Sequence, residues 1–154
     1  MKNQKDAFAP IFLLAALILS LFAACKKEKI DLTDPVPTIL GITISPATVV
    51  EFQDSIIFLI DYRDGDGDLG ENSADAHNLF VTDNRINVTE EFRIRELAPQ
   101  GAEIPITGTL RVVLRNTGIT DNSNSQTVTY TIYIKDRAGN ESERYVTPSI
   151  TVTR

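Results

Sequence analysis

Hydrophobic and polar residues alternate in short runs over most of this chain, and clusters of glycine, proline, asparagine and aspartate separate the runs. Alternation with a period of two is typical of half-buried β-strands, and no stretch after residue 37 has a helical period. The pattern therefore predicts an all-β domain. The predicted strands are Thr38–Ser45, Val49–Glu51, Ser55–Tyr62, Asn78–Thr82, Val88–Leu97, Ile104–Arg115, Thr127–Lys135 and Arg144–Thr153.

Two of these runs indicate which faces are buried. In the run at 127–135 every second residue is apolar, so one face is expected to pack on a core. These apolar residues are Val128, Tyr130, Ile132 and Ile134. The run Ile56–Ile60 is apolar at every position, as expected for a central strand covered on both faces. Seven or eight such strands fit two antiparallel sheets packed face to face, and the predicted fold is an immunoglobulin-like β-sandwich.

The end of the chain adds a resemblance. The segment Tyr133–Ser142 contains the sequence Asp-Arg-Ala-Gly-Asn, and a short β-branched run follows it. It resembles the last hairpin of bacterial immunoglobulin-like and fibronectin-like repeats, in which these residues form the turn. Gly139 and Asn140 suit such a turn because both residue types tolerate positive φ.

The first residues follow a different pattern. Lys2 and Lys5 precede an apolar core from Ile11 to Leu21, and Ala23-Ala24-Cys25 follows it. This order is typical of a secretory signal peptide. Because the core ends at small residues and the single cysteine, the segment resembles the signal of bacterial lipoproteins, which implies that Cys25 is acylated and becomes the first residue. A spanning anchor is the alternative, because the run almost reaches the roughly 18 apolar residues that a membrane helix needs.

The chain is thereby divided into a cleaved signal (1–24), a lipidated cysteine with an extended tether (25–37) and the sandwich domain (38–154). Pro35 and Pro37 favour an extended tether. Two or three acyl chains on Cys25 would hold the protein on a bilayer. Lys26 follows the cysteine where an acidic residue would retain a lipoprotein on the inner membrane, so the resemblance implies the outer membrane, on its periplasmic or its outer side.

The charge of the chain excludes one class of partner. The formal net charge is −6 at pH 7, and it becomes −7 when a signal containing two lysines and one aspartate is removed. Nucleic-acid affinity depends largely on neutralising phosphates, so we expect no nucleic-acid partner. With Cys25 bound to lipid, the domain has no disulfide, and its stability must come from packing, hydrogen bonds and a bound cation if there is one.

An acidic loop follows the predicted central strand. Asp64, Asp66 and Asp68 alternate with glycines, so three carboxylates can converge on a hard cation that needs six to eight oxygen ligands, and calcium is the natural candidate. Loops at one end of a sandwich cluster together, so Asp136 and Asn140 are further candidate ligands. The open alternative is that Asp-Gly pairs simply form turns and the carboxylates face water.

The loop resembles calcium loops of the Asp-x-Asp-x-Asp-Gly kind, but Leu69 stands where the EF-hand requires glycine. It is closer to the Asp-Gly-Asp-Gly-Asp segment of lipoprotein sandwich domains in Bacteroidota. If calcium binds there, its expected role is to stiffen a long loop.

Four arginines form a second candidate site. Arg93 and Arg95 lie on one face of the run at 88–97, and Arg111 and Arg115 lie on the outer face of the run at 104–115. If the two runs pair, the four guanidinium groups form one patch suited to carboxylate or sulfate groups of a glycan or protein. The alternative is that these charges only protect sheet edges and are neutralised by nearby glutamates.

The sequence contains few residues that could form a catalytic site. His77 is the only histidine, which removes most nucleophile–base pairs and most transition-metal sites, and a sandwich this small seldom forms a deep cleft. We therefore expect no enzyme, but a membrane-anchored cell-envelope lipoprotein that acts as a binding or structural module for an envelope partner. The alternative is a glycan-binding surface lipoprotein, although the chain has no tryptophan for sugar stacking.

Overall fold

The computed structural model describes residues 34–154, and the predicted signal, Cys25 and most of the tether lie outside this range. The described residues contain ten β-strands and no helix, which confirms the all-β prediction. The strands are β1 (Thr38–Ser45), β2 (Thr48–Val50), β3 (Ile56–Asp64), β4 (Leu79–Asp83), β5 (Val88–Phe92), β6 (Ile106–Leu114), β7 (Ser125–Val128), β8 (Tyr130–Ile134), β9 (Tyr145–Val146) and β10 (Ile150–Thr153).

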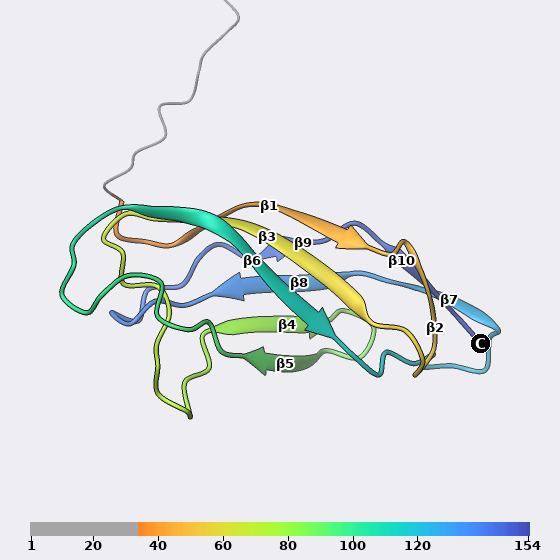
Figure 1. The fold of residues 1–154 in the computed structure, drawn as a ribbon. Coiled ribbons are helices and arrows are strands. Elements are labelled where there is room, and N and C mark those ends of the chain that lie inside the picture. Colours follow the sequence, from red (N-terminus) through yellow and green to blue (C-terminus); the bar gives the residue numbers. More distant parts are fainter. Residues whose placement is uncertain (1–33) are drawn as a thin grey trace, which may run out of the picture. The chain divides into compact units, whose positions relative to one another are not determined.

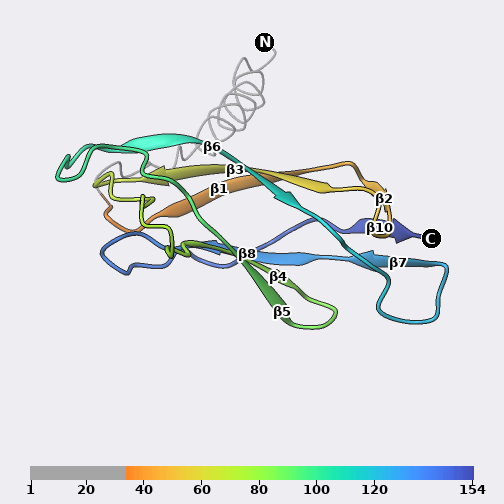
Figure 2. The same cartoon turned by 60° about the horizontal axis from the view of Figure 1, so that its bottom comes forward.

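The strands form three sheets, ordered β1-β3-β6, β5-β4-β8-β9 and β2-β10-β7. Every pair of neighbouring strands is antiparallel except β2 and β10, which are parallel. Figure 1 shows β1, β3 and β6 in one layer and β4, β5 and β8 in the other, and the turned view in Figure 2 separates the same two layers. The arrangement is that of a β-sandwich.

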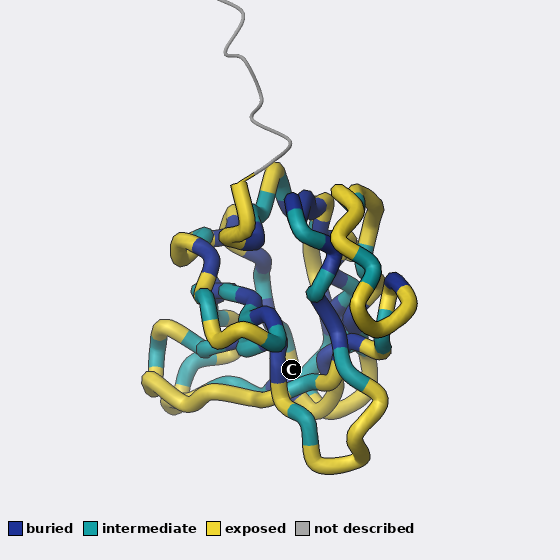
Figure 3. The backbone as a smooth tube through the Cα atoms, turned by 90° about the vertical axis from the view of Figure 1, so that its left-hand side faces the viewer, coloured by how far each residue is buried: buried dark blue, intermediate teal, exposed yellow. Residues whose placement is uncertain are grey.

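The hydrophobic core lies between the layers. Phe58 of β3 meets Tyr130 of β8 edge to face, with ring centroids 5.3 Å apart. Both side chains are fully buried, and Figure 3 shows buried positions on the inner segments and exposed positions on the outer loops. Asp31–Arg154 forms one compact unit that contains every residue of the core cluster. This unit can therefore be produced and studied without the residues before it.

The predicted burial of the run at 127–135 is confirmed, because all four of its alternating apolar residues are buried. The central position of β3 is also confirmed. However, Leu59 in this strand is 38% exposed, so the prediction that both faces are covered is wrong. The outer face of the β1-β3-β6 sheet is open to solvent at this point.

The number of strands is larger than the seven or eight predicted. The run at 127–135 is divided at Thr129 into β7 and β8, which belong to different sheets. The run at 144–153 is divided into β9 and β10 around Pro148, which has no N–H to donate to a ladder. The predicted strand Val88–Leu97 ends already at Phe92.

Candidate metal centre

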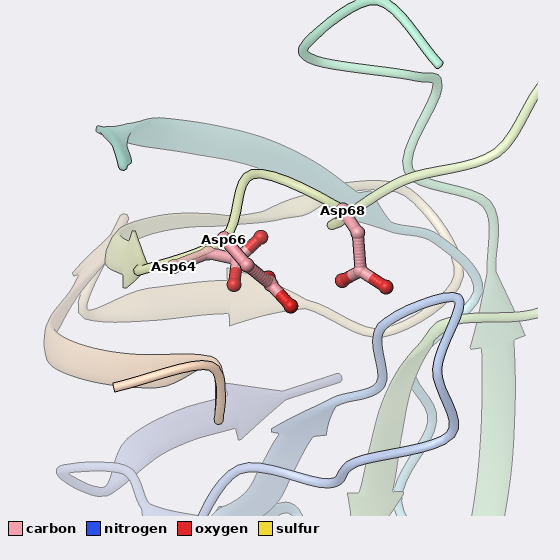
Figure 4. Close-up of side chains that lie close together, drawn as sticks. All are labelled: Asp64, Asp66 and Asp68. Atoms are coloured by element: carbon pink, nitrogen blue, oxygen red, sulfur yellow. The ribbon is translucent and has the colours of Figure 1, made fainter. Parts of the chain in front are cut away.

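The acidic loop begins at the last residue of β3. Asp64 ends the strand, and Asp66 and Asp68 follow in the loop that leads away from it. Figure 4 shows the three side chains gathered on one side of this loop. One carboxylate oxygen of each residue can be chosen so that all three lie within 4.8 Å of one another. Oxygens that share one calcium ion at 2.3–2.6 Å are at most about 5 Å apart, so this spacing fits a common cation.

Glycine is required in this loop because the loop packs closely under other backbone segments. Gly67 has φ 75°, and a Cβ at this position would overlap the carbonyl oxygen of Ile104. Gly70 has φ 90°, and its Cβ would overlap the carbonyl oxygen of Arg95. The segment that follows β5 thus covers the loop, with the Ile104 backbone against Gly67 and the Arg95 backbone against Gly70.

This cover leaves carboxylate oxygens without partners. Asp64 has an exposed fraction of 0%, and its Oδ2 accepts a hydrogen bond from the N–H of Leu69 at 2.7 Å. Asp68 Oδ2 accepts one from the N–H of Ala138 at 2.9 Å. The Oδ1 atoms of Asp64, Asp66 and Asp68 are all buried and have no hydrogen-bond partner. A buried polar atom without a partner is costly, and a cation would satisfy all three at once.

Burial of the loop also raises the pKa values of two of its carboxyl groups. Burial is the main cause that raises the pKa of Asp64 to about 6; the charges of Asp66 and Asp68 add to this rise, and the hydrogen bond from Leu69 opposes it. Burial also raises the pKa of Asp68, together with the charges of Asp136 and Asp66. Without a cation the site therefore resists full ionisation.

The predicted approach of the turn at 136–140 is present in the structure. Besides the Ala138 bond to Asp68, the Arg137 guanidinium donates from Nη1 to the carbonyl oxygen of Gly70 at 2.8 Å. Asp136 and Asn140, however, bond to each other: Oδ1 accepts from the Asn140 N–H at 2.7 Å and Oδ2 from its side-chain amide at 2.8 Å. These two bonds close the turn, and among the carboxylates of residues 34–154 the group whose oxygens converge is Asp64, Asp66 and Asp68, without Asp136.

Sequence reasoning did not identify the positively charged side chain of Arg137, which borders the acidic loop. The Arg137 charge lowers the pKa of Asp68, against the larger effect of burial. Its place in the Asp-Arg-Ala-Gly-Asn turn, which was expected near the loop, was the available signal. Arg137 steadies the loop but leaves the three Oδ1 atoms without a donor.

The arginine site rests on a pairing that the structure does not contain. β5 pairs with β4 in one layer, whereas β6 pairs with β3 in the other, so the condition for the patch, that the two runs pair, is not met. Arg93 and Arg95 lie beyond the end of β5, Arg111 lies on β6 and Arg115 follows it, and all four are exposed. Arg93 donates to the carbonyl oxygen of Ser73 at 2.9 Å. The pairing that was expected to gather the four guanidinium groups is therefore absent.

His77 and Tyr133, two further residues considered in the sequence, have defined partners in the structure. His77 Nδ1 lies 2.7 Å from a carboxylate oxygen of Glu91 on the surface. The ring of Tyr133 stacks on Phe80 at 4.5 Å between centroids, and the Arg144 guanidinium lies 4.4 Å from the same ring. Tyr133 is therefore engaged within the domain.

Comparison of the chain with models of known protein families, with curated proteins and with solved structures finds no match. Between Asp34 and Arg154 there is no helix long and apolar enough to cross a membrane.

Proposed function

We propose that this protein is a lipid-anchored module of a bacterial cell envelope, non-catalytic, with an immunoglobulin-like sandwich that binds calcium through Asp64, Asp66 and Asp68. The observation that carries the calcium proposal is the set of three buried Oδ1 atoms without partners around an aspartate that is fully shielded from solvent. The proposed role of the ion is structural: it stiffens the loop and lets the domain present its surface to an envelope partner.

Calcium explains these observations better than a plain turn does. In a turn without a ligand the carboxylates would face water, where neighbouring charges repel each other weakly. Asp64 is instead buried, with one oxygen satisfied by Leu69 and the other free. Three carboxylates supply three of the six to eight oxygens that calcium takes, and backbone carbonyls, second carboxylate oxygens or water would supply the others.

The immunoglobulin-like assignment is supported by the two facing layers and by the central position of β3. The proposal of a lipid anchor rests on the sequence before residue 34, in which an apolar core ends at Ala23-Ala24-Cys25. The glycan-binding alternative has less support, because Tyr133 is already stacked between Phe80 and Arg144.

Thermal unfolding of residues 31–154 tests the calcium proposal. Calcium at 100 times its dissociation constant stabilises a folded domain by about 2.7 kcal/mol, which corresponds to a rise of about 10 °C in the midpoint. Asp66→Asn should remove most of this rise. Asp75→Asn is the matched control, because Asp75 is exposed and follows the same loop. If millimolar calcium leaves the wild-type midpoint unchanged, the metal proposal is wrong.

Mass spectrometry of the chain purified from membranes tests the anchor separately. The expected first residue is Cys25 carrying acyl chains, and Cys25→Ser should leave the chain unprocessed and without lipid. An intact N-terminus on the mature wild-type protein would contradict the anchor without affecting the calcium proposal.

A further inference from the structure

A cavity lies at the other end of the sandwich from the acidic loop. It has a volume of about 260 Å³ and is bounded by the β4–β5 hairpin, the loop before β3 and the segment after β6. Leu114, in its floor, pairs with the first residue of β3, whereas the acidic loop follows the last residue of that strand. The rest of the floor includes Val81 and Tyr130, both buried. In Figure 1 these elements meet near the end of the β6 arrow.

Three large apolar side chains are exposed at the mouth of this cavity. Phe52, Ile86 and Val88 line it and are 65%, 50% and 54% exposed. Large apolar side chains grouped around a concave site are more typical of a ligand-binding surface than of ordinary exposed positions. Val88 of the edge strand β5 and Leu114 of β6 both line the cavity, and these two strands belong to different sheets.

Phe52, at the mouth, is kept in an unfavourable backbone conformation by its neighbours. Its φ is 58°, which is a rare value for a bulky residue and costs on the order of 1–3 kcal/mol. Its N–H donates to the carbonyl oxygen of Thr117 at 3.1 Å, and its ring lies so close to Gly118 that a Cβ there would overlap it. The surrounding structure thus fixes an exposed aromatic ring over the cavity.

The polar groups of the cavity leave one unpaired charge. Arg85 donates to both carboxylate oxygens of Asp83, at 3.0 Å from Nε and 2.6 Å from Nη2, and its Nη1 donates to Gln126 at 2.7 Å. Its positive charge is therefore neutralised. Glu90 lies opposite the buried Val81 in the β4–β5 pair, and within residues 34–154 its side chain has no hydrogen bond or ion pair. Glu90 is an exposed residue, and partial burial of its carboxylate raises its pKa.

We propose that this cavity binds a small organic ammonium ion whose apolar body rests against Phe52 and Val88 and whose charged nitrogen pairs with Glu90. The apolar walls favour the body of such a ligand, and the one uncompensated charge in the cavity is complementary to its nitrogen. A carboxylate or phosphate ligand would meet Glu90 without a free cation to balance it. The volume suits a ligand smaller than a typical drug molecule.

Three probes of similar shape test this assignment on residues 31–154. They are phenethylammonium, the uncharged 2-phenylethanol and the anionic 3-phenylpropionate, each titrated at pH 7.5 while backbone amide NMR shifts are followed. The ammonium probe should bind about two- to fivefold more tightly than the alcohol, as expected for an ion pair with an exposed carboxylate, and the anion should bind most weakly. The shifts should centre on the β4–β5 hairpin and residues 114–120.

Two variants locate the two halves of the site. Glu90→Gln should abolish the preference for the ammonium over the alcohol, whereas Glu91→Gln, on the opposite face of β5 and paired with His77, should preserve it. Phe52→Gly keeps positive φ accessible, removes the ring and should weaken ammonium and alcohol alike. The proposal is overturned if wild-type protein binds no probe, binds ammonium and alcohol equally, or shows its shifts elsewhere. The comparison of probes on wild-type protein decides the matter even if a variant fails to fold.

Discussion

Asp64→Asn should change the stability of the domain in opposite directions with and without calcium. The wild-type carboxylate is fully buried and has one oxygen without a partner. Asparagine is almost the same size, removes the charge, and keeps an oxygen that can accept the Leu69 N–H. Its amide group can also donate toward the free oxygen of Asp66. In the absence of a cation the substitution therefore replaces a repulsive contact with a hydrogen bond.

The raised pKa of Asp64 sets the magnitude. A rise from the ordinary value of 3.8 to about 6 means that folding at pH 7 with this group ionised costs about 3 kcal/mol. The second amide hydrogen of asparagine lacks an assured partner, so we expect about 1–2 kcal/mol of this to be recovered. For a domain of this size that is a rise of about 4–8 °C in the midpoint measured in chelator. In saturating calcium the wild type should be the more stable protein, because the variant has lost a charged ligand.

The assay is thermal unfolding followed by circular dichroism, with wild type and variant each measured in chelator and in millimolar calcium at pH 7. The expected result is that the variant is more stable than the wild type in chelator and less stable than the wild type in calcium. A variant that is less stable than the wild type in both conditions would show that Asp64 is stabilising without a cation, and the reasoning from burial would be refuted.

The remaining predictions concern pH and packing. In chelator, the stability of the wild type relative to Asp64→Asn should be highest below about pH 4, because the raised pKa keeps the Asp64 carboxyl group protonated in the folded protein. This relative stability should be lost as the pH rises through about 6. Denaturant titrations of both proteins at several pH values measure the difference. Gly70→Ala should destabilise the domain by more than 2 kcal/mol because of its positive φ and the overlap with Arg95, whereas Gly41→Ala, with open space at its Cβ, should change it by less than about 1 kcal/mol in the same titration. Ile132→Ala should cost about 2–5 kcal/mol, because the side chain is completely buried, and an unfolding midpoint as high as that of wild type would contradict the assigned core.

The alternating pattern predicted the positions of most strands and the buried face of the run at 127–135, because burial of one face is a property of each strand by itself. It did not predict which strands pair. Glu91, Phe92, Arg93, Ile94 and Arg95 alternate as a strand would, yet β5 ends at Phe92. Beyond that point the ladder is replaced by side-chain bonds, in which Asn78 donates to the Ile94 carbonyl at 3.2 Å and accepts from its N–H at 2.5 Å.

The convergence of Asp64, Asp66 and Asp68 was predictable, because alternate positions in a glycine-rich loop project to a common side. Their burial was not predictable, since it depends on the segment around Arg95 and Ile104, which is distant in sequence and packs against Gly67 and Gly70. The apolar cavity was missed for a related reason. It exists because β5 and β6 belong to different sheets, and the pattern of either strand alone does not contain that information.

The entry of the chain into the domain lies beside the acidic loop. The carbonyl oxygen of Asp34 accepts a hydrogen bond from the N–H of Gly65 at 3.1 Å, and Thr38, the first residue of β1, pairs with Arg63. A pull applied through a membrane tether would therefore reach this corner before any other part of the sandwich, and peeling of β1 from β3 would start there. If the proposed calcium ion binds, it would stiffen the loop and raise the force at which the domain begins to open, so the calcium concentration around the domain would set its mechanical strength.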